Sequence, residues 1–272
     1  IRARLNLVSS SAKKHKDRYK LASIIELLHT ATLVHDDIVD NSPIRRGIKS
    51  VNNLWTNSHG VLIGDYIYSK AFILMVEIGD MNILKELAAA TNDISQGELI
   101  QLDAIENLNI SLNKLKKISY FKTGRLFEAA ARTGALLNRS NKSFLINISE
   151  SAKNLGILFQ IRDDLLDYSI DLKTGKPSHQ DLREGKVTYP FFFAYKNANK
   201  KEQKQLRDLL GNKKLNQDDA NKLIIKLDGI NKTNKLAKKY FDETIEYANK
   251  IKKMSIKQEM IELANIAINR DK

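Results

Sequence analysis

Two short acidic segments carry side chains whose type and spacing could bind metal ions. Both have the pattern D-D-x-x-D, and their aspartates are Asp36, Asp37, Asp40, Asp163, Asp164 and Asp167. On a helix, residues i and i+4 lie on one face, one turn apart, and like charges placed there repel. A cation would relieve this repulsion, and hard carboxylate oxygens suit Mg²⁺, which shares its coordination shell with phosphate groups. The two segments therefore predict magnesium-binding helix faces.

A solvated acidic helix face is the alternative interpretation of one such segment. Two copies, each inside an otherwise apolar helix, weaken that alternative. A basic loop also follows each copy, with Arg45 and Arg46 after the first and Lys176 and Lys186 after the second. Guanidinium groups bind phosphate oxygens in a bidentate manner. Metal-binding carboxylates beside such cations are typical of a site for diphosphate.

Long helices are needed to position these segments. Apolar residues recur at helical spacing over 20–40, and the sequence Asn41-Ser42-Pro43 should end that helix. We expect further helices at about 61–78, 82–105, 112–136 and 141–170, a loop at about 171–187, and helices over about 188–271 with breaks near Gly211 and Asp228. No segment alternates convincingly with period 2, and the three prolines, Pro43, Pro177 and Pro190, are expected in short polar loops. This pattern predicts an all-α protein.

The composition limits the class of protein further. Hydrophobic residues make up 42% of the 272 residues, which is enough for a sizeable core. Cysteine is absent, which excludes disulfides, cysteine–zinc sites and thiol catalysis. The net charge of +13 favours anionic partners, but aromatic residues are not interleaved with the lysines, so we expect no nucleic acid. No apolar run approaches the roughly 20 residues of a membrane span, and we expect a cytoplasmic protein.

These segments resemble, in order, those of the trans-isoprenyl diphosphate synthases, or polyprenyl synthetases. The similar segments are Glu26 to Asp37, Arg45-Arg46-Gly47, Gly64-Asp65-Tyr66, Lys122-Thr123-Gly124, Gln160 to Asp164, Gly175-Lys176-Pro177, Asp181-Leu182 and Gly185 to Pro190. Each is weak alone, but all of them in this order are highly specific. The resemblance implies a single-domain helical isoprenoid synthase fold with a central cavity lined by two Asp-rich helices. It implies one polyprenyl synthetase domain over residues 1–272, with the N-terminal part of the family domain preceding Ile1.

The resemblance also implies roles for individual residues. The six aspartates are the expected ligands of three Mg²⁺ ions. The expected catalytic residues are Lys122 and the same aspartates without Asp167. The expected contacts to the allylic diphosphate are Arg45, Lys122, Thr123, Gln160, Lys176 and Lys186. The expected contacts to isopentenyl diphosphate are Arg2, His29 and Arg46. The family further implies a homodimer.

The implied reaction joins isopentenyl diphosphate to an allylic diphosphate, for which farnesyl diphosphate is the expected starter. Mg²⁺ and the basic residues stabilise the departing diphosphate, and the double bond of isopentenyl diphosphate attacks the allylic cation that remains. A proton is then lost to the departed diphosphate. The protein's part is electrostatic stabilisation, positioning and the exclusion of water.

Product length is expected to depend on Leu28, Ala31 and Thr32. Ala31 precedes Asp36 by five residues, about 7.5 Å along a helix axis. In short-chain relatives a bulky residue near this position closes the tunnel for the growing tail, whereas Ala31 and Thr32 are small. We expect a hexaprenyl to decaprenyl product, octaprenyl in particular, for quinone side chains. Release of such a tail would involve transient association with the inner face of the membrane.

Several alternatives stay open. One is a geranylgeranyl or other shorter-chain diphosphate synthase. Another is a class I terpene cyclase. The segment Asn92 to Glu98 superficially resembles the second metal motif of those enzymes, but a second D-D-x-x-D favours chain elongation instead. A phosphohydrolase built on His35 and Asp36 would need further histidine ligands. A catalytically silent partner subunit would have no need of two intact acidic segments.

Overall fold

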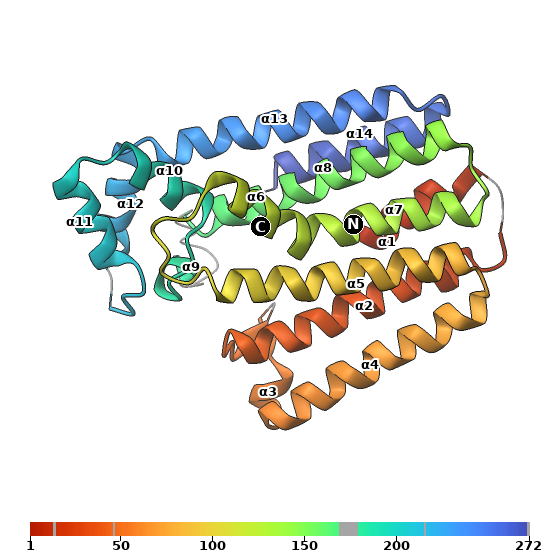
Figure 1. Cartoon of the computed structure of the whole chain (residues 1–272), viewed down its shortest axis with the longest axis horizontal. Coiled ribbons are helices and arrows are strands. Elements are labelled where there is room, and N and C mark those ends of the chain that lie inside the picture. The colour runs from red at the N-terminus through yellow and green to blue at the C-terminus, as the bar shows by residue number, and fades with distance from the viewer. Residues whose placement is uncertain (13–14, 46, 169–178, 215, 271–272) are drawn as a thin grey trace. The chain divides into compact units, whose positions relative to one another are not determined.

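The computed structural model describes residues 1–12, 15–45, 47–168, 179–214 and 216–270. Helices account for nearly all the regular structure in these ranges (Figure 1), which confirms the all-α fold class. The chain groups into two compact units, which are described separately. The first unit comprises Ile1–Asn92 and Leu126–Ser149, and the second comprises Asp93–Arg125 and Glu150–Lys272.

The first unit carries the first acidic segment at the end of a long helix. Its elements are α1 (Arg2–Ser9), the 3-10 turn η1 (Ser10–Ala12), α2 (Arg18–Val39), β1 (Ile44–Arg45), β2 (Ile48–Lys49), α3 (Val51–Leu54), α4 (Asn57–Ile78), the first half of α5 (Met81–Leu102), nearly all of α7 (Arg125–Leu137) and the start of α8 (Lys142–Leu166). In Figure 1, α2 and α4 lie side by side. The buried side chains of Leu21, Ile24, Ile25 and Leu28 give α2 its core-facing side.

Two glycines allow α4 to approach the acidic end of α2. A Cβ atom on Gly64 would lie 2.2 Å from Nε2 of His35, and one on Gly60 would lie 2.7 Å from Cδ1 of Ile38. Any side chain at either position would therefore push the helices apart. Because His35 and Ile38 flank Asp36 and Asp37 in the sequence, this close contact fixes where the acidic segment lies on the first unit.

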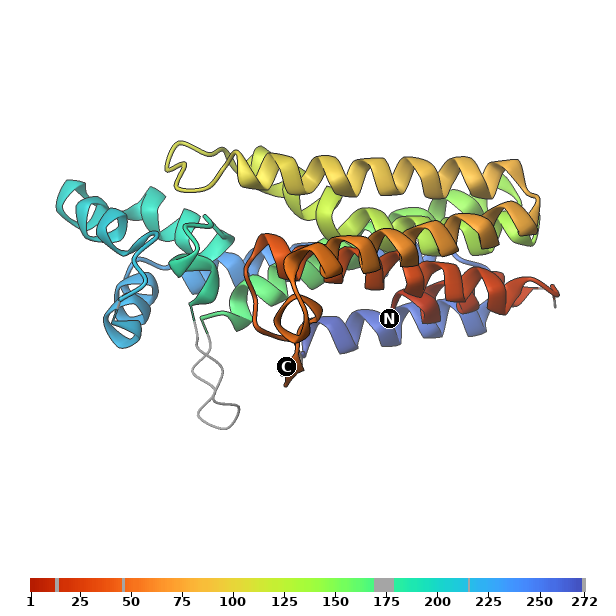
Figure 2. The ribbon, with the colours of Figure 1, turned by 90° about the horizontal axis from the view of Figure 1, so that it is seen from below.

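The second unit carries the second acidic segment near the end of α8. Its remaining elements are α6 (Leu112–Ser119), η2 (Tyr120–Gly124), α9 (Gln180–Arg183), α10 (Tyr189–Asn197), α11 (Lys200–Leu209), α12 (Gln217–Lys226), α13 (Gly229–Asn249) and α14 (Met254–Ile268). Helices α10, α11 and α12 gather together in both views (Figures 1 and 2), and α13 packs against α10 and α14. Fully buried side chains such as Ile161, Phe191 and Met260 form the core of this unit.

Local structure differs from the sequence expectations in several places. Pro190 lies in the first turn of α10 rather than in a loop, because a helix start does not need the N–H that proline lacks. The expected loop over 171–187 contains the short helix α9. The helix expected over 112–136 is interrupted by η2, one turn of π-helix. Further breaks separate α10 from α11 and α13 from α14.

A small antiparallel hairpin follows α2. Its strands β1 and β2 have two residues each, with Ile44 opposite Lys49 and Arg45 opposite Ile48. Strands this short leave no alternating pattern, so the sequence did not reveal them. Among the described residues, no helix combines the length and the apolar character that crossing a membrane would require.

Candidate active site

The first acidic segment is joined to the hairpin by a partly buried ion pair. Asp37 lies on the last turn of α2 with 3% of its surface exposed. Its Oδ1 accepts a hydrogen bond of 2.6 Å from Nε of Arg45 on β1. Its backbone oxygen accepts two more hydrogen bonds, from Ser42 N at 2.9 Å and Asn52 Nδ2 at 3.2 Å. A predicted metal ligand and a predicted diphosphate contact are therefore already paired, while the neighbouring Arg46 lies outside the described residues.

Two residues expected to contact isopentenyl diphosphate also meet in the first unit. Arg2 Nη1 donates a hydrogen bond of 2.8 Å to Nε2 of His29. In this contact Nε2 is the acceptor, because a guanidinium can only donate. The guanidinium of Arg2 also lies 4.8 Å from the ring centre of Phe127, a cation–π contact. His29 is seven residues before Asp36, about 10 Å along α2.

His35 packs between α2 and α4. Its Nε2 lies 3.2 Å from the backbone oxygen of Val61 and 3.3 Å from Oδ1 of Asp65. Within the described ranges, no group of three or more histidine, aspartate or glutamate side chains is arranged to hold a metal ion. The phosphohydrolase alternative therefore lacks its further histidine ligands among these residues.

The second acidic segment belongs to a continuous hydrogen-bond network. The hydroxyl of Thr123 donates to Oε1 of Gln160 at 2.6 Å, and Nε2 of Gln160 donates to Oδ1 of Asp164 at 2.9 Å. The backbone N–H of Tyr189 donates to the other oxygen of Asp164 at 3.4 Å. Three residues predicted separately for substrate and metal binding are thus brought into one chain of contacts.

Negative charge accumulates around Asp164 and Asp167. Burial, followed by the nearby charge of Asp181, raises the pKa of the Asp164 carboxyl well above its usual range. The same two causes raise the pKa of Asp167 to about 7, although the backbone N–H groups of Gln180 and Asp181 both donate to this carboxylate. Desolvated carboxylates that repel one another favour a divalent cation, and their oxygen donors fit Mg²⁺.

The charge of Asp181 acts on both Asp164 and Asp167, although Asp181 was not predicted as a site residue. Its position in the segment Asp181-Leu182, shared with the family, was the signal that could have found it. Lys186, by contrast, was predicted to contact the allylic diphosphate, and its Nζ lies 2.7 Å from Oε2 of Glu184. Its predicted companion Lys176 lies outside the described residues.

The predicted catalytic lysine lies on the π turn η2. Nζ of Lys122 donates to Oε2 of Glu98 at 2.9 Å and to Oε1 of Gln101 at 2.8 Å, both on α5. A Cβ atom on Gly97 would lie 2.9 Å from the backbone nitrogen of Lys122, so α5 approaches the turn closely there. Single π turns within helices are frequent at functional sites. Glu98 and Gln101 were not predicted as site residues, because only the folded chain brings them to Lys122.

The segment that resembled a terpene cyclase motif has other partners in the second unit. Asp93 Oδ2 accepts a hydrogen bond of 2.8 Å from Nε of the largely buried Arg125. Glu98 is bonded to Lys122, and Gly97 is buried against η2. Through these contacts the segment Asn92 to Glu98 packs against the π turn η2 and the residue that follows it.

The expected chain-length residues differ in burial. Leu28 and Ala31 are fully buried, whereas Thr32 is partly exposed and donates its hydroxyl hydrogen to the backbone oxygen of His29 at 2.8 Å. All three therefore lie on α2 as predicted, with Leu28 and Ala31 enclosed by neighbouring atoms.

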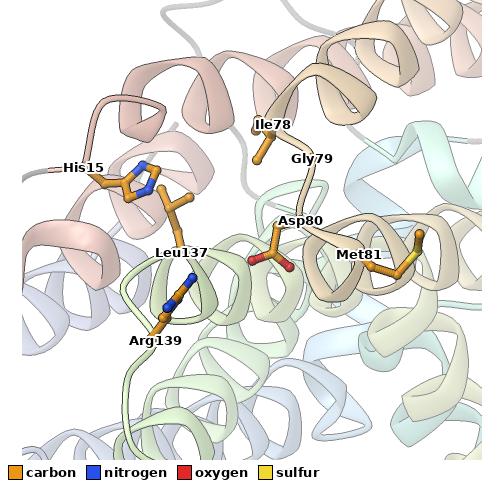
Figure 3. Close-up of a pocket in the computed structure, with 7 residues that line it drawn as sticks. All are labelled: His15, Ile78, Gly79, Asp80, Met81, Leu137 and Arg139. Carbon is orange, nitrogen blue, oxygen red and sulfur yellow. The ribbon is translucent and has the colours of Figure 1, made fainter.

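A separate pocket lies at the opposite end of α2 (Figure 3). It has a volume of about 320 Å³ and is lined by His15, Ile78, Gly79, Asp80, Met81, Leu137 and Arg139. His15 precedes α2, whereas Asp40 follows it, so roughly 30 Å of helix separates this pocket from the first acidic segment. The pocket therefore takes no part in holding the predicted metal ligands of this unit.

Comparison with known proteins decides the family. The polyprenyl synthetase sequence profile matches residues 1–227. This chain belongs to the polyprenyl synthetase family. Octaprenyl diphosphate synthase of Escherichia coli is 33% identical over 255 residues, which span 93% of this chain and 79% of that enzyme. Geranylgeranyl diphosphate synthase of Saccharolobus solfataricus is 35% identical over 260 residues, which span 91% and 78%.

A solved structure supports the same conclusion. The crystal structure of a polyprenyl synthase from Caulobacter crescentus CB15, complexed with calcium and isoprenyl diphosphate, superposes with a TM-score of 0.92. It is 32% identical, and the match covers 100% of this chain and 85% of that one. This polyprenyl synthetase is therefore a metal-dependent prenyltransferase of the trans-polyprenyl diphosphate synthase type, and its substrates are isoprenyl diphosphates.

Proposed function

We propose that this polyprenyl synthetase extends farnesyl diphosphate with isopentenyl diphosphate to octaprenyl diphosphate, used for quinone side chains. The observation that carries the length is the pair of small residues Ala31 and Thr32, one turn before the first acidic segment, with no phenylalanine, tyrosine or tryptophan between 28 and 34. The compared relatives include both an octaprenyl and a geranylgeranyl diphosphate synthase, so the length rests on these side chains. A geranylgeranyl product is the second candidate.

The carboxylate oxygens of the two acidic segments suit magnesium by their chemistry, although no three acidic or histidine side chains among the described residues are arranged around an ion site in this structure. Three Mg²⁺ ions would be held by Asp36, Asp37, Asp40, Asp163, Asp164 and Asp167. When bound, they supply positive charge that stabilises the diphosphate leaving group. The elevated pKa values of Asp164 and Asp167 support this assignment, because a bound cation would stabilise their ionised forms.

The basic side chains of the protein bind and orient the two substrates. In our proposal Arg45, Lys122 and Thr123 hold the allylic diphosphate, together with Gln160, Lys176 and Lys186. Arg2, His29 and Arg46 hold isopentenyl diphosphate so that its double bond is placed for attack. The hydrogen bond between Arg2 and His29 keeps these two side chains together on the first unit. Fixed donors of this kind stabilise developing charge without reorganising.

Product analysis tests this proposal. The purified protein is incubated with Mg²⁺, isopentenyl diphosphate and farnesyl diphosphate, and the extracted products are separated by chain length. We expect octaprenyl diphosphate as the main product. Diphosphate release without isopentenyl diphosphate would instead identify a terpene cyclase, and a product that stops at geranylgeranyl would refute the proposed length.

Ala31→Phe tests the role of the buried alanine. A phenyl ring one turn before Asp36 should close the path of the tail and shorten the products by several five-carbon units. Ala31→Leu is the second variant if the larger ring prevents folding, and it should shorten the products less. Thr30→Phe is the matched control, because Thr30 is exposed on α2 and its change should leave the product distribution unaltered.

A homodimer and a transient membrane contact complete the proposal. Leu62, Tyr66, Ile73 and Val76 are each more than half exposed and recur at helical spacing on one face of α4. Exposed apolar stripes of this kind favour association with another surface, here a second copy of the chain. Sedimentation of the double variant with Leu62→Glu and Ile73→Glu should give monomers if this face mediates dimerisation.

Lipid vesicles should accelerate product release, since a long prenyl tail is poorly soluble in water.

A further inference from the structure

An arginine that follows α14 reaches the second acidic segment. Nη1 of Arg270 donates a hydrogen bond to Oδ1 of Asp163. Asp163 is one of the proposed metal ligands, and it is separated from Arg270 by 107 residues in the sequence. No motif around Arg270 indicated a part in the site, so this contact became evident only in the folded second unit.

Two further contacts hold Arg270 beside α8 independently of that carboxylate. Its guanidinium lies 4.4 Å from the ring centre of Phe159, a cation–π contact. Its backbone oxygen accepts a hydrogen bond of 2.9 Å from Nη2 of Arg162. Phe159, Arg162 and Asp163 lie within one stretch of five residues on α8. The main chain and the guanidinium are thus both anchored to this stretch.

A divalent ion on Asp163 would compete with the guanidinium for the same carboxylate. Two cations at one carboxylate repel each other, so metal binding there would weaken the ion pair. The side chains of Arg270 and Asp163 are 29% and 38% exposed, and ligands from solution can reach both. Because Phe159 and Arg162 keep Arg270 in place, its N–H donors would remain within reach of an anion bound beside Asp163.

The first acidic segment also contains an arginine–aspartate pair. Arg45, already proposed as a contact to the allylic diphosphate, is paired with Asp37, a proposed metal ligand. Arg270 and Asp163 form an arginine–aspartate pair of the same kind, although Asp163 is the first aspartate of its segment and partly exposed, whereas Asp37 is the second and buried. A planar guanidinium suits both carboxylate and diphosphate, because its parallel N–H groups bind either anion in a bidentate manner.

We propose that Arg270 is a substrate-binding residue, which exchanges its bond to Asp163 for the diphosphate of the allylic substrate when metal binds. The proposal rests on the proposed function and adds a residue to that site. It predicts opposite effects of Arg270→Ala on two ligands. The metal alone loses a competitor and should bind at least as tightly, whereas diphosphate loses a partner and should bind more weakly.

Titration calorimetry with the full chain measures both ligands. The first titration uses Mn²⁺ alone, and the second uses inorganic diphosphate in saturating Mg²⁺. Loss of a hydrogen bond to a charged group should weaken diphosphate binding by about ten- to a hundredfold in Arg270→Ala. Arg270→Lys keeps the charge without the planar fork and should fall between this variant and the wild type.

The matched control is Arg207→Ala, which removes the same charge from the exposed surface of α11 in the same unit. It should leave both affinities unchanged. Circular dichroism and the melting temperature establish that each variant is folded before it is titrated.

The possible outcomes are distinct. Unchanged diphosphate affinity in folded Arg270→Ala overturns the role of Arg270. A loss of affinity for both Mn²⁺ and diphosphate also overturns it, because that result would indicate that Arg270 only supports the structure of the site. If the wild type itself shows no Mg²⁺-dependent binding of diphosphate, the proposed function fails and this inference fails with it. Weaker diphosphate binding with undiminished Mn²⁺ binding supports the exchange.

Discussion

The second aspartate of each acidic segment is buried, but the two have different partners. Asp37 is 3% exposed and bonded to the cationic Arg45, whereas Asp164 is 5% exposed and bonded to the neutral Gln160 and to a backbone N–H. The first carboxylate is therefore balanced by the protein itself. Among the described residues the second has no such cationic partner, and its pKa is raised by burial and by Asp181. The comparison indicates that the second segment depends more strongly on an added cation for its ionised form.

The largest expected effect is on turnover, and it should be shared by both segments. Asp36→Ala and Asp163→Ala each remove a proposed metal ligand, and each should lower kcat by several orders of magnitude with little loss of fold. Steady-state kinetics in saturating Mg²⁺ measures this effect. Asp208→Ala, which alters an exposed residue on α11, is the control. Near-wild-type turnover in both variants would remove the basis for a metal site at either segment.

An intermediate effect is expected where α5 supports the π turn of the second unit. In Gly97→Ala the new methyl group would meet Cβ of Phe121 at 2.8 Å and the backbone nitrogen of Lys122 at 2.9 Å. Since a displacement of about 1 Å can cost a hundredfold in rate, kcat/KM for the allylic substrate should fall by roughly that factor. Gln96→Ala changes an exposed neighbour on the same helix and should have no effect. Equal kinetics for the two variants would show that η2 tolerates the shift.

The smallest expected effect is on stability, and it separates the two buried aspartates. Without divalent ions, Asp37→Asn should lower the free energy of unfolding by about 1–3 kcal/mol, because Arg45 loses its charged partner. Asp164→Asn should leave stability unchanged or raise it. The pKa of Asp164 is higher in the folded chain than in the unfolded one, so its ionisation at neutral pH opposes folding, and asparagine removes that charge. Urea unfolding monitored by circular dichroism measures both values, and a larger loss at position 164 would reverse the comparison.

The features predicted best from the sequence were those set by neighbouring residues. The helices α2, α4, α5 and α8 follow from apolar spacing, which is a local property. The carboxylate pairs were visible for the same reason, since i and i+4 on any helix share a face. Pro190 was misplaced because proline fits the first turn of a helix as well as a loop.

The parts that escaped prediction depend on contacts between distant residues. Glu98 and Gln101 meet Lys122 only because Gly97 lets α5 approach the π turn. Asp181 acts through its charge on Asp164 and Asp167. Arg270 reaches Asp163 after more than a hundred intervening residues. None of these contacts follows from a periodic pattern, because each is created by tertiary packing.

The hydrogen-bond chain from Thr123 through Gln160 to Asp164 has a thermodynamic consequence. Thr123 at one end is a proposed contact to the allylic diphosphate, and Asp164 at the other end is a proposed metal ligand. The side-chain amide of Gln160 lies between them, with its oxygen toward Thr123 and its NH₂ toward Asp164. An event at either end changes the environment of the same amide. The two binding equilibria should therefore be linked, and linkage is reciprocal: the factor by which metal tightens diphosphate equals the factor by which diphosphate tightens metal.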